Sequence, residues 1–182
     1  MILITGANGQ LGKEFQKFLS EKNREVLALD IQELDITDLE KTRKILKNIQ
    51  AEYIINCAAY NDVDKAQEEW KKAFSVNAIG VRNLAIVAAE TGAELVHFSS
   101  DYVFSGNRNV PYTIYDRPNP INKYGESKVL GERFLKELNN KYYLVRTSWL
   151  FGDGEKNFLR KVLLWASSRQ KIRVVDDEVS SP

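Results

Sequence analysis

The sequence predicts an α/β fold, a Rossmann-type doubly wound parallel sheet, from three observations. Short apolar runs such as ILIT, YIIN and LVHF are typical of strands buried on both faces of a parallel sheet. Longer segments with helical periodicity lie between these runs, and this alternation implies right-handed crossovers with helices on both faces. The glycine-rich turn TGANGQLG directly follows the first apolar run, where such folds bind phosphate.

Six strands are expected, each a short apolar or β-branched run. They are Ile2–Thr5, Glu25–Leu29, Tyr53–Cys57, Glu94–Ser99, Tyr142–Thr147 and Ile172–Val175.

Four amphipathic helices are expected between these strands, because apolar residues recur with a period near 3.6. Their apolar stripes are Leu11, Phe15, Phe18 and Leu19; Leu39, Leu46 and Ile49 after a Thr37/Asp38 cap; Val81, Leu84, Ala85 and Ala88; and Leu130, Phe134 and Leu138. The stretch Ser105–Asn122 holds three of the four prolines and is expected to be a long loop. Loops of that length inside a compact domain are usually functional.

Length and composition restrict the class of protein. A chain of 182 residues can build one core, or one domain plus part of another. Its 26 basic and 25 acidic residues are scattered, which gives no sign of a nucleic-acid or membrane-surface binder. The single Cys57 and single His97 exclude a disulfide framework and a Cys/His metal cluster, so no metal site is expected. No signal peptide and no apolar run of roughly 20 residues is present, so we expect a soluble, cytoplasmic protein.

Gly6, Gly9 and Gly12 occupy the first strand–helix junction, spaced as G-x-x-G-x-x-G. Glycine at these positions permits a tight turn and lets the backbone approach a pyrophosphate at the helix N-terminus. Asp30 ends the second strand, where an acid accepts the ribose hydroxyls and favours NADH over NADPH. The alternative is that Asp30 is an ordinary loop or cap acid.

Tyr124 and Lys128 are four residues apart on an expected helix, so phenol and ammonium share one face. A nearby ammonium favours the phenolate and brings the tyrosine pKa closer to neutral, as an acid–base catalyst needs. The alternative is a surface tyrosine and a surface lysine. Ser99 and Ser100 end the fourth strand and point to opposite faces, so only one can face a cofactor. The residues alone leave that choice open.

The motifs TGANGQLG, NCAAYNDVDKA, FSSDYVFSG, YGESK and RTSWLFG occur in this order along the whole chain. As a set they resemble the extended short-chain dehydrogenases/reductases, and most closely the dTDP-4-dehydrorhamnose reductase family. The resemblance implies that Tyr124 donates a proton, that Lys128 binds the nicotinamide ribose and tunes Tyr124, and that Ser100 fills the Ser/Thr position. It implies two further sets of residues. The dinucleotide-lining set is Gly9, Gln10, Leu11, Asp30, Asp35, Ile36, Ala59, Tyr60 and Asn61, and the sugar-nucleotide set is Ser100, Asp101 and Trp149.

The implied activity is NAD(P)H-dependent reduction of the 4-keto group of a dTDP-4-dehydro-6-deoxy sugar, with NADH slightly favoured by Asp30. We expect a cofactor-binding domain over residues 1–152 and the start of a substrate-binding lobe over 153–182, the rest of that lobe being absent. Asn61 stands where the family usually carries Thr. Two alternatives share these residues: another sugar-nucleotide epimerase or dehydratase, and a regulatory subunit similar to methionine adenosyltransferase β. A homodimer stays open.

Overall fold

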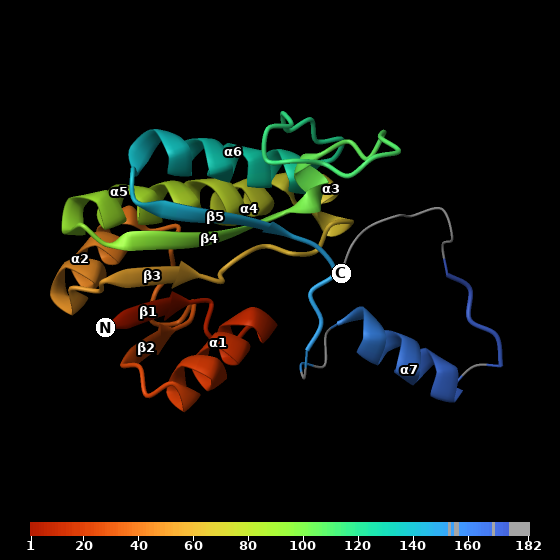
Figure 1. The fold of residues 1–182 in the computed structure, drawn as a ribbon, viewed down its shortest axis with the longest axis horizontal. Helices are drawn as coiled ribbons and strands as arrows, with labels where there is room; N and C mark the ends of the chain where they lie inside the picture. The colour runs from red at the N-terminus through yellow and green to blue at the C-terminus, as the bar shows by residue number, and fades with distance from the viewer. Residues whose placement is uncertain (153, 155–156, 169, 175–182) are drawn as a thin grey trace.

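A five-stranded parallel sheet forms the centre of the protein (Figure 1), in a computed structural model that describes residues 1–152, 154, 157–168 and 170–174. The strands are β1 (Ile2–Thr5), β2 (Val26–Leu29), β3 (Tyr53–Asn56), β4 (Glu94–Ser100) and β5 (Tyr142–Thr147). Their spatial order is β2-β1-β3-β4-β5, with every neighbouring pair parallel. The predicted fold class is therefore confirmed, and the first five predicted strands end within one residue of the observed ones.

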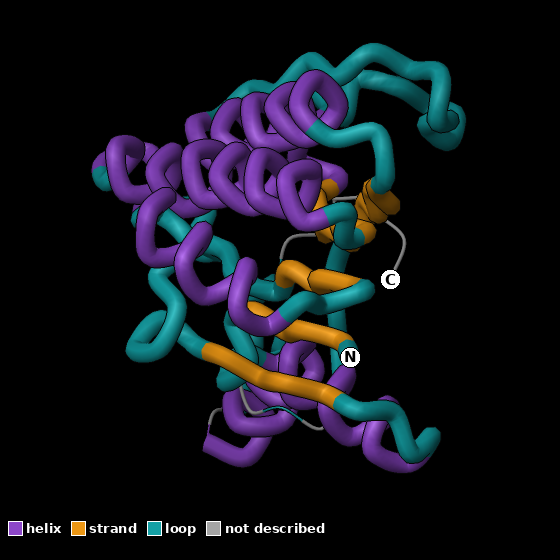
Figure 2. The backbone as a smooth tube through the Cα atoms, turned by 90° about the vertical axis from the view of Figure 1, so that its left-hand side faces the viewer, coloured by secondary structure: helices purple, strands orange, loops and turns teal. Residues whose placement is uncertain are grey.

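The direction of each crossover decides which face a helix covers. The chain passes from β1 to β2 in one direction across the sheet, and from β2 through β3 and β4 to β5 in the other. Because such crossovers are right-handed, α1 (Gln10–Glu21) covers one face, while α2 (Leu39–Ile49), α5 (Val81–Thr91) and α6 (Lys123–Leu138) cover the other. Figure 2 shows helices on both sides of the strands. Shorter elements complete the second layer: α3 (Lys65–Glu68), α4 (Trp70–Phe74), the π-helix η1 (Ser75–Gly80) and the 3₁₀ turn η2 (Asp101–Val103).

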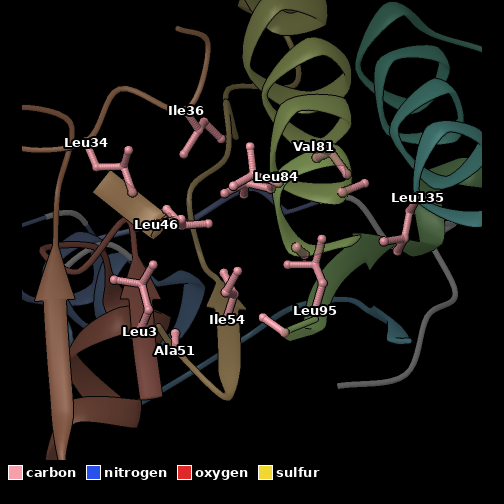
Figure 3. Close-up of a cluster of buried hydrophobic side chains, with 14 residues drawn as sticks. Leu3, Leu34, Ile36, Leu46, Ala51, Ile54, Val81, Leu84, Leu95 and Leu135 are labelled. Atoms are coloured by element: carbon pink, nitrogen blue, oxygen red, sulfur yellow. The ribbon is translucent and has the colours of Figure 1, made fainter. Parts of the chain in front are cut away.

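The main apolar core lies between the sheet and the α2–α5–α6 layer (Figure 3). Leu3, Ile54 and Leu95 from neighbouring strands meet Leu84 of α5 there, and each is fully buried. A smaller cluster on the opposite face joins Ile4 and Ile55 to the α1 side. Burying apolar surface on both faces contributes the largest favourable term to folding, at roughly 25 cal/mol per Å².

Burial on both faces holds for the central strands but not for the two edges. All of β1 is buried, whereas β5 alternates, with Tyr143 and Val145 exposed. The prediction of two-faced burial was therefore wrong for β2, which is half-buried throughout, and for β5. An edge strand has a neighbour on only one side, so fewer residues cover it.

The predicted sixth strand is also wrong over Ile172–Val174, which form no regular structure, and Val175 lies outside the described residues. A strand exists only where a neighbour completes its hydrogen bonds. The preceding helix α7 (Phe158–Ser168) stands to one side of the sheet in Figure 1 and has no buried residue.

The predicted loop Ser105–Asn122 is confirmed, since no helix or strand forms there. The aromatic rings of Phe104 and Tyr112 stack at 4.1 Å and anchor it, and Arg108 lies over the Tyr112 ring at 5.3 Å. No helix of the described chain is both long and apolar enough to cross a membrane.

Candidate active site

The predicted site residues gather at the carboxyl ends of the parallel strands. The chain leaves β1 and β3 in opposite directions, which makes the ends of these two strands a topological switch point. Such switch points are where open α/β sheets bind ligands. The glycine turn follows β1, the segment Ala59–Asn61 follows β3, and Ser100 ends β4.

The glycine turn is shaped by close backbone approach. Gly6 has a φ of +64°, and a Cβ there would lie 2.5 Å from the Ala58 backbone nitrogen. A Cβ on Gly12 would lie 2.5 Å from the Gly6 carbonyl oxygen, whereas Gly9 is less constrained. Gly9 caps α1 without any side-chain hydrogen bond, so the helix N-terminus is not closed by its own cap residue. A dinucleotide pyrophosphate fits this arrangement, because helix N-termini attract anions. Gln10 and Leu11 follow in the first turn, and Gln10 donates to the Leu150 carbonyl oxygen at 3.3 Å.

Asp30 lies directly beside the glycine turn. Its carboxylate accepts hydrogen bonds from the backbone N–H groups of Asn8 and Ile31, both at 2.6 Å. Asp35 instead accepts from the backbone and hydroxyl of Thr37, at 2.9 and 2.7 Å. Ile36 is buried in the main core, so its side chain packs against α5. Of these three residues, Asp30 is the one whose carboxylate hydrogen-bonds to the glycine turn, through the Asn8 N–H.

A buried asparagine that the sequence analysis did not identify joins the β3 side of the site to α6. The Asn77 side-chain oxygen accepts from the Tyr60 N–H at 2.9 Å, and its amide donates to the Tyr60 carbonyl and the Ser127 hydroxyl, both at 3.0 Å. Ser127 in turn donates to the Tyr124 carbonyl oxygen at 2.6 Å. Asn77 lies in the π-helix η1, an element that often marks functional sites. The segment SVNAIG carries no charged residue and no recognisable motif that would have revealed the role of Asn77.

Tyr124 is buried, with 8% of its surface exposed, and its ring packs edge-on against Tyr102 at 5.6 Å. Burial raises the pKa of the phenol above its usual value, while the Ser100 hydroxyl acts in the opposite direction. Desolvation of the phenolate is the largest effect on this pKa, and the tuning of Tyr124 by Lys128 stays a prediction. The alternative of a surface tyrosine and a surface lysine is wrong, since Tyr124 and Lys128 are both buried.

The two adjacent serines occupy different surroundings. Ser100 donates to the Asp101 carboxylate at 2.9 Å and lies near enough to Tyr124 to lower its pKa. The Ser99 hydroxyl is buried and makes no hydrogen bond of ordinary length within the described chain. It lies close enough to the Glu132 carboxylate to help lower the pKa of that group. Ser100 is therefore the serine on the Tyr124 side.

Lys128 points from α6 into the end of β4. Its ammonium donates to the Phe98 carbonyl oxygen at 2.6 Å, and only 2% of the residue is exposed. Burial lowers the pKa of Lys128 to about 8, against the attraction of Glu132. The lysine therefore changes charge much closer to neutral pH than a free lysine does.

A buried polar layer crosses the sheet beneath the site. Thr5 donates to the Asn56 side-chain oxygen at 2.8 Å, and the Ala58 N–H donates to the same oxygen at 3.1 Å. The Asn56 amide must then donate to His97 Nδ1, 3.1 Å away, which leaves the imidazole proton on Nε2. Burial and the nearby Lys128 charge hold the pKa of His97 well below its usual value. His97 is therefore a buried core residue that is hydrogen-bonded through Nδ1.

Asp101 and Trp149 are the other two residues predicted to contact the sugar nucleotide. Asp101 directly follows β4, and Trp149 comes shortly after the end of β5. Asp101 opens η2 and accepts from the Tyr102 N–H at 3.0 Å, next to Ser100. Trp149 follows β5 with a φ of +48°, and its ring packs edge-on against Phe158 at 5.1 Å.

Cys57, directly after β3, is half-buried, and burial raises the pKa of its thiol to about 12. Within the described part of the chain, no three His, Cys, Asp or Glu side chains are grouped as metal ligands.

The family model for the RmlD substrate-binding domain matches residues 1–182. The chain belongs to this family. A curated dTDP-4-dehydrorhamnose reductase of Aggregatibacter actinomycetemcomitans is 43% identical to this chain, in an alignment that covers 100% of this chain and 62% of the relative. A crystal structure of a dTDP-4-dehydrorhamnose reductase from Clostridium acetobutylicum aligns with a TM-score of 0.97 and 48% identity, over 100% of this chain and 64% of that one. A crystal structure of a dTDP-4-dehydrorhamnose reductase from Bacillus anthracis, in complex with NADP, aligns with a TM-score of 0.91 and 44% identity. That alignment covers 94% of this chain and 61% of the other. The chain thus spans about three fifths of the length of these relatives.

Proposed function

We propose that the chain carries the cofactor-binding and catalytic part of an NAD(P)H-dependent reductase that acts on the 4-keto group of a dTDP-4-dehydro-6-deoxy sugar. The observation that carries this proposal is the meeting of Ser100, Tyr124 and Lys128 at the end of β4, in the sheet whose β1 leads into the glycine turn. The relatives named above support the choice of substrate. In this proposal residues 1–152 bind the cofactor and residues 153–182 begin the substrate-binding lobe. A cytoplasmic location and a homodimer belong to the same proposal.

A bound reduced nicotinamide would supply hydride to the keto carbon. Negative charge then grows on the keto oxygen, and a hydroxyl donor is needed to stabilise it. Ser100 is the fixed donor, because its hydroxyl is held at the strand end by Asp101 and the Tyr102 N–H. Tyr124 provides the proton: its raised pKa keeps the phenol protonated at neutral pH. Lys128 is charged below about pH 8 and offers its remaining N–H donors to the ribose.

The test is oxidation of NADH and NADPH with dTDP-4-dehydrorhamnose, for this chain and for the full-length protein. Tyr124→Phe keeps the ring that packs on Tyr102 but removes the transferable proton, so we expect cofactor binding without turnover. Tyr115→Phe is the control, because Tyr115 is exposed on the loop. Retained turnover in Tyr124→Phe would refute the role of that residue. Nucleotide binding without turnover by any form, together with co-purification of a larger enzyme, would favour the regulatory subunit instead.

We further propose that NADH is preferred over NADPH. The Asp30 carboxylate is fixed by two backbone N–H groups beside the glycine turn, where it would accept ribose hydroxyls and repel a 2′-phosphate. We expect Asp30→Ala to change the ratio of the NADH and NADPH dissociation constants by about tenfold or more in favour of NADPH, equivalent to about 1.4 kcal/mol. Isothermal titration with both nucleotides measures this ratio, and Glu21→Ala on the exposed end of α1 is the control. An unchanged ratio would show that Asp30 does not select the cofactor.

A further inference from the structure

The buried face of α6 carries polar and charged side chains beside apolar ones such as Leu135. Tyr124, Ser127, Lys128 and Glu132 are all buried on this helix, and Glu132 has 1% of its surface exposed. A buried carboxylate is expensive unless it is paired and hydrogen-bonded. The cost of burying the Glu132 carboxylate must therefore be offset by a partner, and Glu132 takes no part in the proposed reaction.

The partner of Glu132 comes from β5. Arg146 donates from Nε to one carboxylate oxygen at 2.9 Å and from Nη2 to the other at 2.6 Å, a bidentate pair. Lys136 approaches the same carboxylate at 3.7 Å from the exposed side. Burial alone would raise the pKa of Glu132, but Arg146 and Ser99 hold it below its usual value. Glu132 is therefore ionised at neutral pH.

Arg146 is fixed from its other side by the long loop. The Phe104 ring lies 5.0 Å from the guanidinium, and Tyr112 stacks on Phe104. Since two contacts hold Arg146, the Glu132 carboxylate has one defined position on the Lys128 helix.

Glu132 lies four residues after Lys128, one helical turn away on the same buried face. Among the described residues, Glu132 is the carboxylate whose charge acts on Lys128. On β4 the lysine acts on neutral His97, and on its own helix Tyr124 lies one turn earlier; η1 contributes the neutral Asn77 amide, which bonds to the adjacent Ser127, and Asp101 of η2 acts on Tyr124. Ala73 of α4 clusters with Tyr124, and Val81 of α5 lies against Gly131, so these two contacts on α6 are apolar. The Phe98 carbonyl oxygen accepts from the Lys128 ammonium, and Glu132 is the charged group that favours its charged form.

We propose that Glu132 is a positioning residue: clamped by Arg146, it holds its carboxylate behind Lys128 and keeps that ammonium charged and directed at the carboxyl end of β4. The consequence for catalysis rests on the proposed function, because it assumes that Lys128 binds the cofactor ribose. The electrostatic part does not depend on any activity and can be measured on the chain alone.

The experiment is a pH titration of ¹³C-labelled lysine side chains by NMR, with the Lys128 signal assigned from Lys128→Arg. We expect Glu132→Gln to lower the Lys128 midpoint by about 1 pH unit or more, the usual effect of losing an opposite charge at this range. The matched control is Glu90→Gln, which breaks the ion pair between Arg43 of α2 and Glu90 of α5 and should leave the midpoint unchanged. If Glu132→Gln does not fold, the double variant Glu132→Gln/Arg146→Gln removes the pair without leaving a buried charge, and a smaller fall is expected.

A folded variant of either kind with an unchanged Lys128 midpoint would overturn the proposal, as would an equal shift in Glu90→Gln. NADH binding measured across the same pH range separates the two hypotheses. A shifted titration midpoint in a chain that binds no nucleotide would contradict the proposed function but leave the role of Glu132 intact. Nucleotide binding whose pH dependence follows the lysine midpoint would support both.

Discussion

Asn77→Ala is the perturbation that tests most directly how the site is held together. The substitution removes three hydrogen bonds, two to the Tyr60 backbone and one to Ser127. At about 1 kcal/mol for each bond, the expected loss in the free energy of unfolding is about 3 kcal/mol. With a urea m-value of roughly 2 to 3 kcal/mol per molar for a protein of this size, the unfolding midpoint should fall by about 1 M.

Asn83→Ala is the matched control for this measurement. Asn83 is equally buried on α5 and donates to the Ile36 and Thr37 carbonyl oxygens at 2.9 and 3.0 Å, and its side-chain oxygen accepts a longer bond from Arg82 at 3.5 Å. We expect a loss of about 2 kcal/mol from its two donated bonds, with the Asn77 contacts to Tyr60 and Ser127 left in place. Asn77→Ala should lose more stability and also bind nucleotide more weakly, because Tyr60 and the start of α6 are released. A smaller loss of stability in Asn77→Ala than in Asn83→Ala would refute this reasoning.

Two further predictions concern α6. The pKa of Lys128 is about 8 in the folded chain and about 10.4 in an unfolded one, so between these values the unfolded state binds more protons and stability rises with pH. Relative to Lys128→Met, the wild type should therefore gain roughly 3 kcal/mol between about pH 8 and 10.5, measured by urea unfolding at several pH values; a constant difference would contradict this. Gly131→Ala should destabilise the protein by about 1 to 3 kcal/mol, because its Cβ would lie 2.2 Å from the Asn77 carbonyl oxygen. In the same unfolding assay, Arg133→Ala on the exposed face should be nearly neutral, and a stabilising Gly131→Ala would show that the helices can separate freely.

The parallel sheet was predictable because its information is local. Each strand is a short apolar run, and each connection carries helical periodicity, so type and order follow from the pattern. The glycine turn was predictable for the same reason, since the close backbone approach at Gly6 and Gly12 requires glycine at these positions. The expected strand at 172–174 failed because pairing depends on a neighbouring edge, which no single segment encodes.

The buried face of α6 was not predictable from hydrophobic periodicity. The stripe Leu130, Phe134 and Leu138 suggested an apolar face, but Leu138 is exposed and none of the three is fully buried. The buried side carries Lys128 and Glu132 instead. Periodicity assumes that charged residues face water, and that assumption fails where partners on other strands neutralise the charge.

The choice between Ser99 and Ser100 likewise depends on tertiary structure. Alternation along a strand predicts that only one of the two hydroxyls faces a given layer. In the structure both serines lie near residues of α6, and what separates them is the position along that helix: Ser100 lies near Tyr124 and Ser99 near Glu132. Asn77 was missed for the same reason, because its partners Tyr60 and Ser127 are distant in the sequence.

The polar interior of α6 follows from what the site requires. The helix crosses the sheet beside the end of β4, so any phenol and ammonium that reach this edge must lie under neighbouring helices and lose their water. Desolvation raises the pKa of Tyr124 and lowers that of Lys128, which makes the phenol a weaker acid and the ammonium less charged. A carboxylate behind the lysine opposes the second change, and a guanidinium on β5 keeps that carboxylate from being an unpaired buried charge. Replacing Glu132 and Arg146 together by apolar residues could therefore stabilise the fold, as it does for many buried ion pairs, and still weaken the function of Lys128. This pattern of stability gained while the lysine charge is lost would distinguish an ion pair kept for the site from one kept for the fold.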